Sequence, residues 1–106
     1  MKAVVCTELG EPSKLKVQEI DLGDVGDNQL LISVEAAGVN FPDALLVQGK
    51  YQIVIDPPFI PGNEIAGIVK EVGNNVSTKV GTKIIGLPEI GAFAEEIILD
   101  SNAVIP

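Results

Sequence analysis

Cys6 is the only cysteine of the chain, and no histidine accompanies it. Because Ser–His and Cys–His catalysis both need an imidazole to activate the nucleophile, neither is possible within this chain. Cys6 ends the apolar run Ala3–Cys6, so we expect a small core residue and not a reactive thiol. A single cysteine forms no intrachain disulfide, which suits a reducing, cytoplasmic compartment.

The charge of the chain argues against two classes of partner. Fifteen acidic and 7 basic residues give a formal net charge of -8. Nucleic acids and anionic membrane surfaces both attract clusters of Lys and Arg, which an acidic chain does not offer. No segment approaches the ~20 apolar residues of a membrane helix, and the N-terminus lacks the apolar stretch of a secretion signal. We therefore expect neither a nucleic-acid partner nor a membrane partner.

Short strands separated by turns dominate the sequence. In Lys14–Ile20 polar and apolar residues alternate, which predicts a strand with one wet face. In Gln29–Ala37 the residues Leu30, Ile32 and Val34 share a face, and Leu31 predicts partial burial of the other. The complete set of predicted strands is Lys2–Cys6, Lys14–Ile20, Gln29–Ala37, Ile65–Val72, Lys83–Leu87, Phe93–Leu99 and Ala103–Ile105.

One short helix interrupts the strands. Asn40 is a good N-cap, Pro42 suits a first turn, and Asp43 complements the positive end of the helix dipole. Gly49 can supply the left-handed residue that ends the helix after about two turns. The proline-rich segment 51–62 predicts an ordered, extended loop. Many short strands with one helix predict a single mainly β domain over residues 1–106, a barrel or a sandwich and not a doubly wound α/β sheet.

Four segments together resemble the medium-chain dehydrogenase/reductase superfamily. They are Ala36–Asp43, Pro57–Val69, Val72–Gly73 with Val80–Ile84, and Gly91–Glu95. The resemblance implies the N-terminal, chaperonin-10-like (GroES-like) domain of such an enzyme. That domain is a partly open β-barrel with one or two short helices, and it carries catalytic residues.

The second domain of that family, a Rossmann domain that binds NAD(P)H, has no counterpart in the sequence. No Gly-x-Gly-x-x-Gly motif lies between a strand and a helix. A single βαβ unit already takes ~30 residues, for which the predicted strands leave no room. We therefore expect the Rossmann domain to be absent from this chain.

Asn40 and Asn63 occupy the positions where zinc-dependent members of the superfamily place a cysteine and a histidine. Amides are poor zinc ligands, and Asp43 and Glu64 alone would make a weak site. With the surrounding motifs intact, the chain resembles the zinc-free quinone or enone reductases, and we expect no bound metal.

The resemblance also implies roles for individual residues in a complete enzyme. It places Asn40 beside the nicotinamide and the substrate carbonyl, where its amide could donate a hydrogen bond in addition to capping the helix. It places Tyr51 near the same cleft, in contact with cofactor or substrate, although a surface aromatic is the alternative. Phe41 and Asn63 are the expected lining of the substrate cleft, and Asn63 is alternatively a turn residue.

Two functions follow, and they belong to different classes. The first is the N-terminal domain of a zinc-independent NADPH:quinone or enone oxidoreductase-like protein, inactive alone because the nucleotide-binding domain is missing. NADPH is the cofactor that the resemblance implies for the full-length protein, and we expect no cofactor to bind tightly to this chain alone. The second is a non-catalytic truncated or engineered β-barrel module that self-associates through a bare inter-domain surface or unpaired edge strands. A chaperonin-10-like co-chaperone shares the expected fold, but the motifs around Asn40 and Asn63 argue against it.

Overall fold

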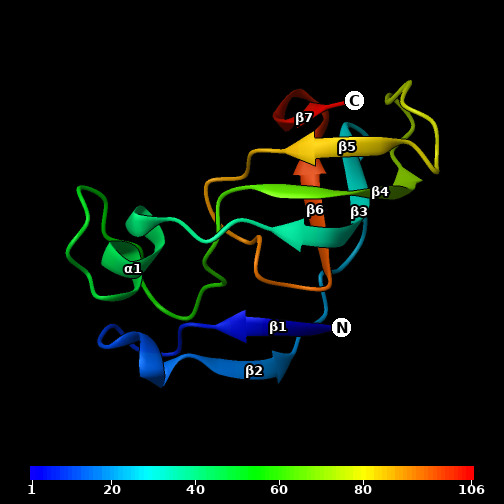
Figure 1. Cartoon of the computed structure of the whole chain (residues 1–106). Helices are drawn as coiled ribbons and strands as arrows, with labels where there is room; N and C mark the ends of the chain where they lie inside the picture. The colour runs from blue at the N-terminus through cyan, green and yellow to red at the C-terminus, as the bar shows by residue number, and fades with distance from the viewer.

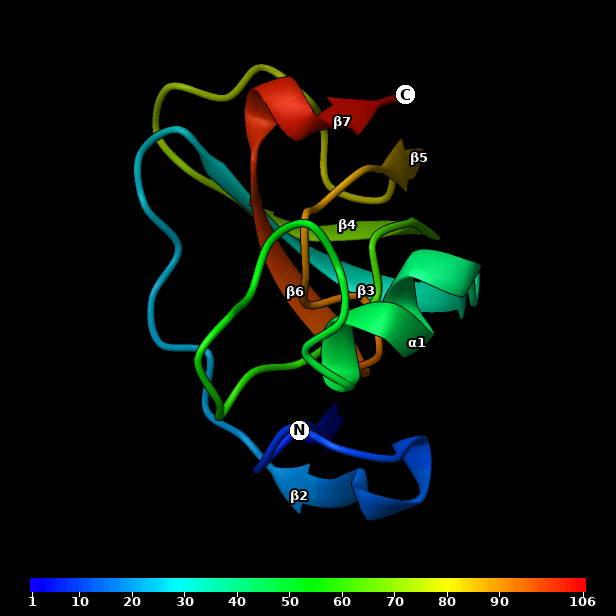
Figure 2. The same ribbon diagram turned by 90° about the vertical axis from the view of Figure 1, so that its left-hand side faces the viewer.

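A computed structural model describes all 106 residues of the chain. The strands form a two-stranded ribbon, β1-β2, and a five-stranded sheet in the order β6-β3-β4-β5-β7, with every pairing antiparallel. In Figures 1 and 2 the five-stranded sheet lies above the ribbon, with the helix α1 beside both. The elements are β1 Lys2–Val5, β2 Lys16–Glu19, β3 Gln29–Ala37, α1 Phe41–Val47, β4 Ile65–Val72, β5 Lys83–Gly86, β6 Glu96–Asp100 and β7 Val104–Ile105, with short 3-10 turns at Pro12–Lys14 and Ser101–Ala103. The predicted mainly β, partly open barrel with a short helix is confirmed.

The main core lies on one face of β3. This strand pairs with β4 on one side and β6 on the other, so it is the best-covered strand of the sheet. Leu30 and Ile32 are fully buried, as the alternation predicted, and Leu31 is half-buried on the opposite face. The core that they anchor consists of Leu30, Ile32, Ile65, Val69, Ile84, Ala92, Ile97 and Leu99.

Gly67 marks a close approach between β3 and β4. A Cβ atom at this position would collide with the backbone oxygen of Ser33 and would lie 2.7 Å from Ile32 Cγ2. The register between the two strands also shifts between Val34 and Ala36. Only a residue without a side chain permits this spacing, as expected for a glycine inside a strand.

A second, smaller core lies between β1 and α1. It consists of Cys6, Leu46, Val47 and Phe59. Cys6 is 1% exposed, and burial raises the pKa of its thiol above the ordinary value. The expected inert, core role of Cys6 is therefore consistent with its surroundings.

The predicted amphipathic strand at Lys14–Ile20 is wrong in two respects. The strand β2 covers only Lys16–Glu19, because Pro12–Lys14 forms a 3-10 turn. All its residues are exposed, and Val17 is 68% exposed. The physical reason is that β2 pairs only with β1, so no second layer covers the apolar face that the alternation indicated.

The segment predicted as a strand from Phe93 is divided between the two sheets. The strand β6 begins at Glu96, whereas the preceding residues bond to β1. Val4 N–H donates to Phe93 O at 2.8 Å, and Glu95 N–H donates to Lys2 O at 3.0 Å. These bonds hold the β1-β2 ribbon against the larger sheet.

The helix α1 begins and ends where the sequence predicted. Its N-cap is Asn40, and Gly49 follows its last turn with a φ of 71°. No helix of the structure is long and apolar enough to span a membrane.

Candidate functional site

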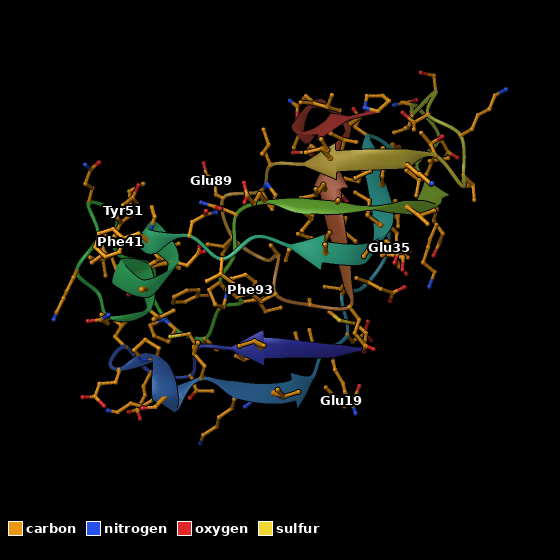
Figure 3. All side chains as sticks on the ribbon, viewed as in Figure 1. Glu19, Glu35, Phe41, Tyr51, Glu89 and Phe93 are labelled. Carbon is orange, nitrogen blue, oxygen red and sulfur yellow. The ribbon has the colours of Figure 1, made fainter.

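A pocket of about 210 Å³ opens beside α1. Its walls come from three parts of the chain: the helix, the extended segment that leads into β4, and the connection between β5 and β6. Figure 3 shows Tyr51 beside α1, whose first residue is Phe41, and Glu89 between α1 and the five-stranded sheet. The lining residues are Pro42, Asp43, Leu46, Tyr51, Ile53, Ile55, Asn63 and Glu89.

Two loops distant in sequence are joined where they form the pocket wall. Gly91 N–H donates to Ile60 O at 2.7 Å, and Phe93 N–H donates to Pro61 O at 3.0 Å. Between them, Ala92 N–H donates to Gly62 O at 3.2 Å. This bonding brings Glu89 and Asn63 to the same cavity.

Asn40 and Asn63 are hydrogen-bonded to each other. Asn40 Nδ2 donates to Asn63 Oδ1 at 3.0 Å, in a half-buried position. Two side chains separated by 23 residues therefore form one amide pair at the start of α1 and the edge of the pocket.

Asp43 fixes the first turn of α1. Its Oδ2 accepts a hydrogen bond from Asn40 N–H at 2.7 Å, the acidic half of a capping box with Asn40. Asp43 is 6% exposed and is the only charged residue in the buried class. A carboxylate so placed also complements the positive end of the helix dipole, which matches the structural role expected for it.

The structure brings together three of the four residues that were predicted from the sequence to form the site. Tyr51 and Asn63 line the pocket, and Asn40 is bonded to Asn63. Phe41 is 76% exposed and does not line the pocket of this chain. Its expected place in a substrate cleft stays a prediction for a complete protein.

Glu89 lines the pocket but was not predicted from the sequence to be a site residue. It lies in a connection with no regular structure, after a proline, and far in sequence from the motif around Asn40. The bonds between residues 60–62 and 91–93 place it there, and no local pattern encodes such bonds. With Asp43 it gives the pocket two carboxylates and no cationic side chain.

No group of three or more His, Cys, Asp or Glu side chains gathers in a way that could hold a metal ion. The polar groups that do gather at the pocket are amides, carboxylates and one phenol. The amides and the phenol of this set can donate hydrogen bonds to an uncharged oxygen acceptor, whereas the carboxylates can only accept them.

A curled antiparallel sheet, one short capped helix and an amide-bearing pocket beside that helix define a chaperonin-10-like β domain. Residues 26–106 match the family model described as the alcohol dehydrogenase GroES-like domain. The chain therefore belongs to that family, as the four motifs indicated.

Its relatives include quinone oxidoreductase-like members of the medium-chain dehydrogenase/reductase superfamily. Quinone oxidoreductase-like protein 2 of Rattus norvegicus is 39% identical over 102 residues, which cover 95% of this chain and 29% of that protein. A probable oxidoreductase from Mycobacterium abscessus superposes with a TM-score of 0.94 at 34% identity, over 100% of this chain and 34% of that one. The Escherichia coli quinone oxidoreductase, solved in complex with NADPH, superposes with a TM-score of 0.91 at 25% identity, over 99% of this chain and 32% of that one. The chain thus spans about 30% of the length of the proteins it matches.

Proposed function

We propose that this chain is the N-terminal domain of a zinc-independent NADPH:quinone or enone oxidoreductase-like protein, and that it does not turn over substrate alone. The observation that carries the proposal is the Asn40–Asn63 amide pair at the edge of the pocket beside α1. Two amides stand where zinc-dependent relatives would hold metal ligands, and amides suit a carbonyl better than they suit zinc.

In a complete protein of this kind, NADPH held mainly by another domain would supply the hydride. As a conjugated carbonyl accepts hydride, negative charge grows on its oxygen, and a proton from water completes the hydroquinone or saturated ketone. The contribution of this chain is orientation and electrostatics. An amide N–H aimed at the oxygen stabilises the growing charge, and the apolar walls, among them Leu46, Ile53 and Ile55, exclude water from the ring.

The residues of the pocket fit a single ring and not the whole dinucleotide. A cavity of about 210 Å³ is smaller than the ~300–1,000 Å³ of drug-sized ligand pockets. Phosphates need cationic side chains or a helix N-terminus in a nucleotide fold, and no Lys or Arg lines this pocket. The adenine and phosphate end of NADPH must therefore bind to another domain, which is why we expect inactivity.

The isolated chain should oxidise NADPH no faster than a protein-free control in the presence of 1,4-naphthoquinone. The decrease in absorbance at the NADPH band measures this directly. Zinc added in equimolar amount should also be lost on desalting, as metal analysis of the protein fraction will show. Turnover above background would contradict inactivity, and stoichiometric retained zinc would contradict zinc independence.

A second proposal concerns the isolated chain itself, which we expect to self-associate. Neighbouring strands place Ala36 opposite Ala66, Ala66 opposite Ile85, and Ile85 opposite Ile105. These side chains form an exposed apolar row across four strands, and Ile85 and Ile105 are 53% and 54% exposed. A second copy of the same row is its simplest partner, because exposed apolar patches of this kind favour association.

Light scattering at increasing concentration should show a dimer or larger species for the wild type. Ile85→Lys places a charge in the middle of the row and should shift the mass to that of a monomer. Val80→Lys changes an exposed apolar residue outside the row, 61% exposed against 53% for Ile85, and serves as the matched control. A wild-type monomer at high concentration would contradict the proposal.

We also propose a reducing, cytoplasmic location, which the buried free thiol of Cys6 supports.

A further inference from the structure

The orientation of Asn40 is fixed from two sides. The capping box brings the Asn40 side chain to the backbone N–H of Asp43, which also donates to Asn40 backbone O at 3.0 Å, while the Asp43 carboxylate accepts from the Asn40 backbone N–H at 2.7 Å. Only the amide oxygen can accept from a backbone N–H. The Nδ2 group of Asn40 must then point away from the helix, and it does so toward Asn63.

This orientation determines that of Asn63 in turn. Asn40 Nδ2 is a donor, so Asn63 must present its oxygen, and the Nδ2–Oδ1 distance is 3.0 Å. A planar amide that turns its oxygen to Asn40 turns its NH2 group the other way. The structure gives Asn63 Nδ2 no acceptor within the protein, and Asn63 lines the pocket.

We propose that the side-chain NH2 of Asn63 is the hydrogen-bond donor for the carbonyl oxygen of an uncharged ligand in this pocket, and that Asn40 is a positioning residue that aims it. The inference rests on the proposed function and reassigns the donor within it, since the resemblance to reductases pointed to Asn40. The donor comes from the segment before β4, and its direction is set by the cap of α1.

The pocket also selects the charge of its ligand. Asp43 and Glu89 are its only charged groups, and both are carboxylates. An anionic ligand would meet like charges in a partly apolar cavity, which is unfavourable. Neutral ketones, enones and quinones are the carbonyl compounds that match one amide donor, apolar walls and no cation.

The inference is tested by ¹⁵N NMR of the 106-residue chain, titrated with cyclohexanone as a neutral single-ring probe. The largest side-chain amide shift should fall on the NH2 group of Asn63, and the NH2 group of Asn40 should move less. Cyclohexanecarboxylate, of similar size but anionic, should shift neither.

Two variants at position 63 separate the donor from the added charge. Asn63→Asp keeps an oxygen for Asn40 Nδ2 but offers no NH2, and Asn63→Leu removes the donor without adding charge. Both should weaken cyclohexanone binding about two- to ten-fold while leaving the backbone spectrum of the fold unchanged. Asn40→Asp retains a good cap but faces Asn63 with a carboxylate oxygen, which only accepts. The Asn63 NH2 group should therefore turn toward position 40 and away from the pocket, its resonances should shift in the absence of ligand, and cyclohexanone binding should weaken as in the variants at position 63.

The outcomes distinguish the inference from the proposed function. If the Asn40 NH2 shifts most and both variants at position 63 bind as the wild type does, the donor assignment is wrong although the pocket still binds carbonyl compounds. If cyclohexanone shifts no residue of the pocket, the carbonyl-binding role is wrong, and the proposed function loses its main support. If Asn63→Asp weakens cyclohexanone binding but Asn63→Leu does not, the effect comes from the added charge and the assignment of Asn63 as donor is wrong.

Discussion

Gly67→Val should destabilise the chain by about 3 kcal/mol or more, which is a large part of the ~5–15 kcal/mol typical of a domain. The added Cβ meets the backbone oxygen of Ser33, and backbone cannot move aside as a flexible side chain can. Ile32, 2.7 Å from the new atom at its Cγ2, is fully buried and has no space to repack. Strands β3 and β4 must therefore separate locally, and with them the centre of the main core.

Ala66→Val is the matched control, since it introduces the same side chain one position earlier on the same strand. Ala66 is exposed on the opposite face of β4, in the apolar row proposed for self-association, so at a concentration where the chain is a monomer this change should alter stability by less than ~0.5 kcal/mol. Urea unfolding followed by far-ultraviolet circular dichroism measures both variants. If the two variants were equally stable, strands β3 and β4 would have to lie farther apart at Gly67 than they do in the structure.

The sequence was sufficient for the elements that depend on local chemistry. The helix α1 is encoded by Asn40, Asp43 and Gly49, whose capping and stop functions act within one or two turns. The central strand β3 was predictable because burial on one face leaves a period-two pattern around Leu30 and Ile32.

Prediction failed where a residue's environment depends on distant segments. Val17 carries the alternation of a half-buried strand, yet only the sheet topology reveals that nothing covers β2. The same limit applies to the site. The motifs located Asn40 and Asn63, but their mutual hydrogen bond and the presence of Glu89 depend on how separate loops meet.

The carboxylate of Asp43 caps α1 and also holds Asn40, which is bonded to Asn63. A substitution at Asp43 should therefore change both the stability of the chain and the geometry of the site. Asp43→Ala should cost about 1–3 kcal/mol, because the backbone N–H of Asn40 loses its acceptor in a half-buried position and the helix loses its capping box. The first turn should fray, and Asn40 should lose the constraint that directs its Nδ2 toward Asn63.

Asp43→Asn is the matched control, because its amide oxygen can still accept from Asn40 N–H. It removes only the charge at the helix N-terminus, worth about 0.3–1 kcal/mol, and should leave the orientation of Asn63 intact. Thermal unfolding measures the stability of both variants, and the side-chain NH2 signals of Asn40 and Asn63 report the geometry of the amide pair. If Asp43→Ala lowers stability but leaves both NH2 signals unchanged, the cap supports the helix without aiming the pocket donor. Loss of both together would show that one carboxylate holds the helix start and orients the amide that faces the ligand.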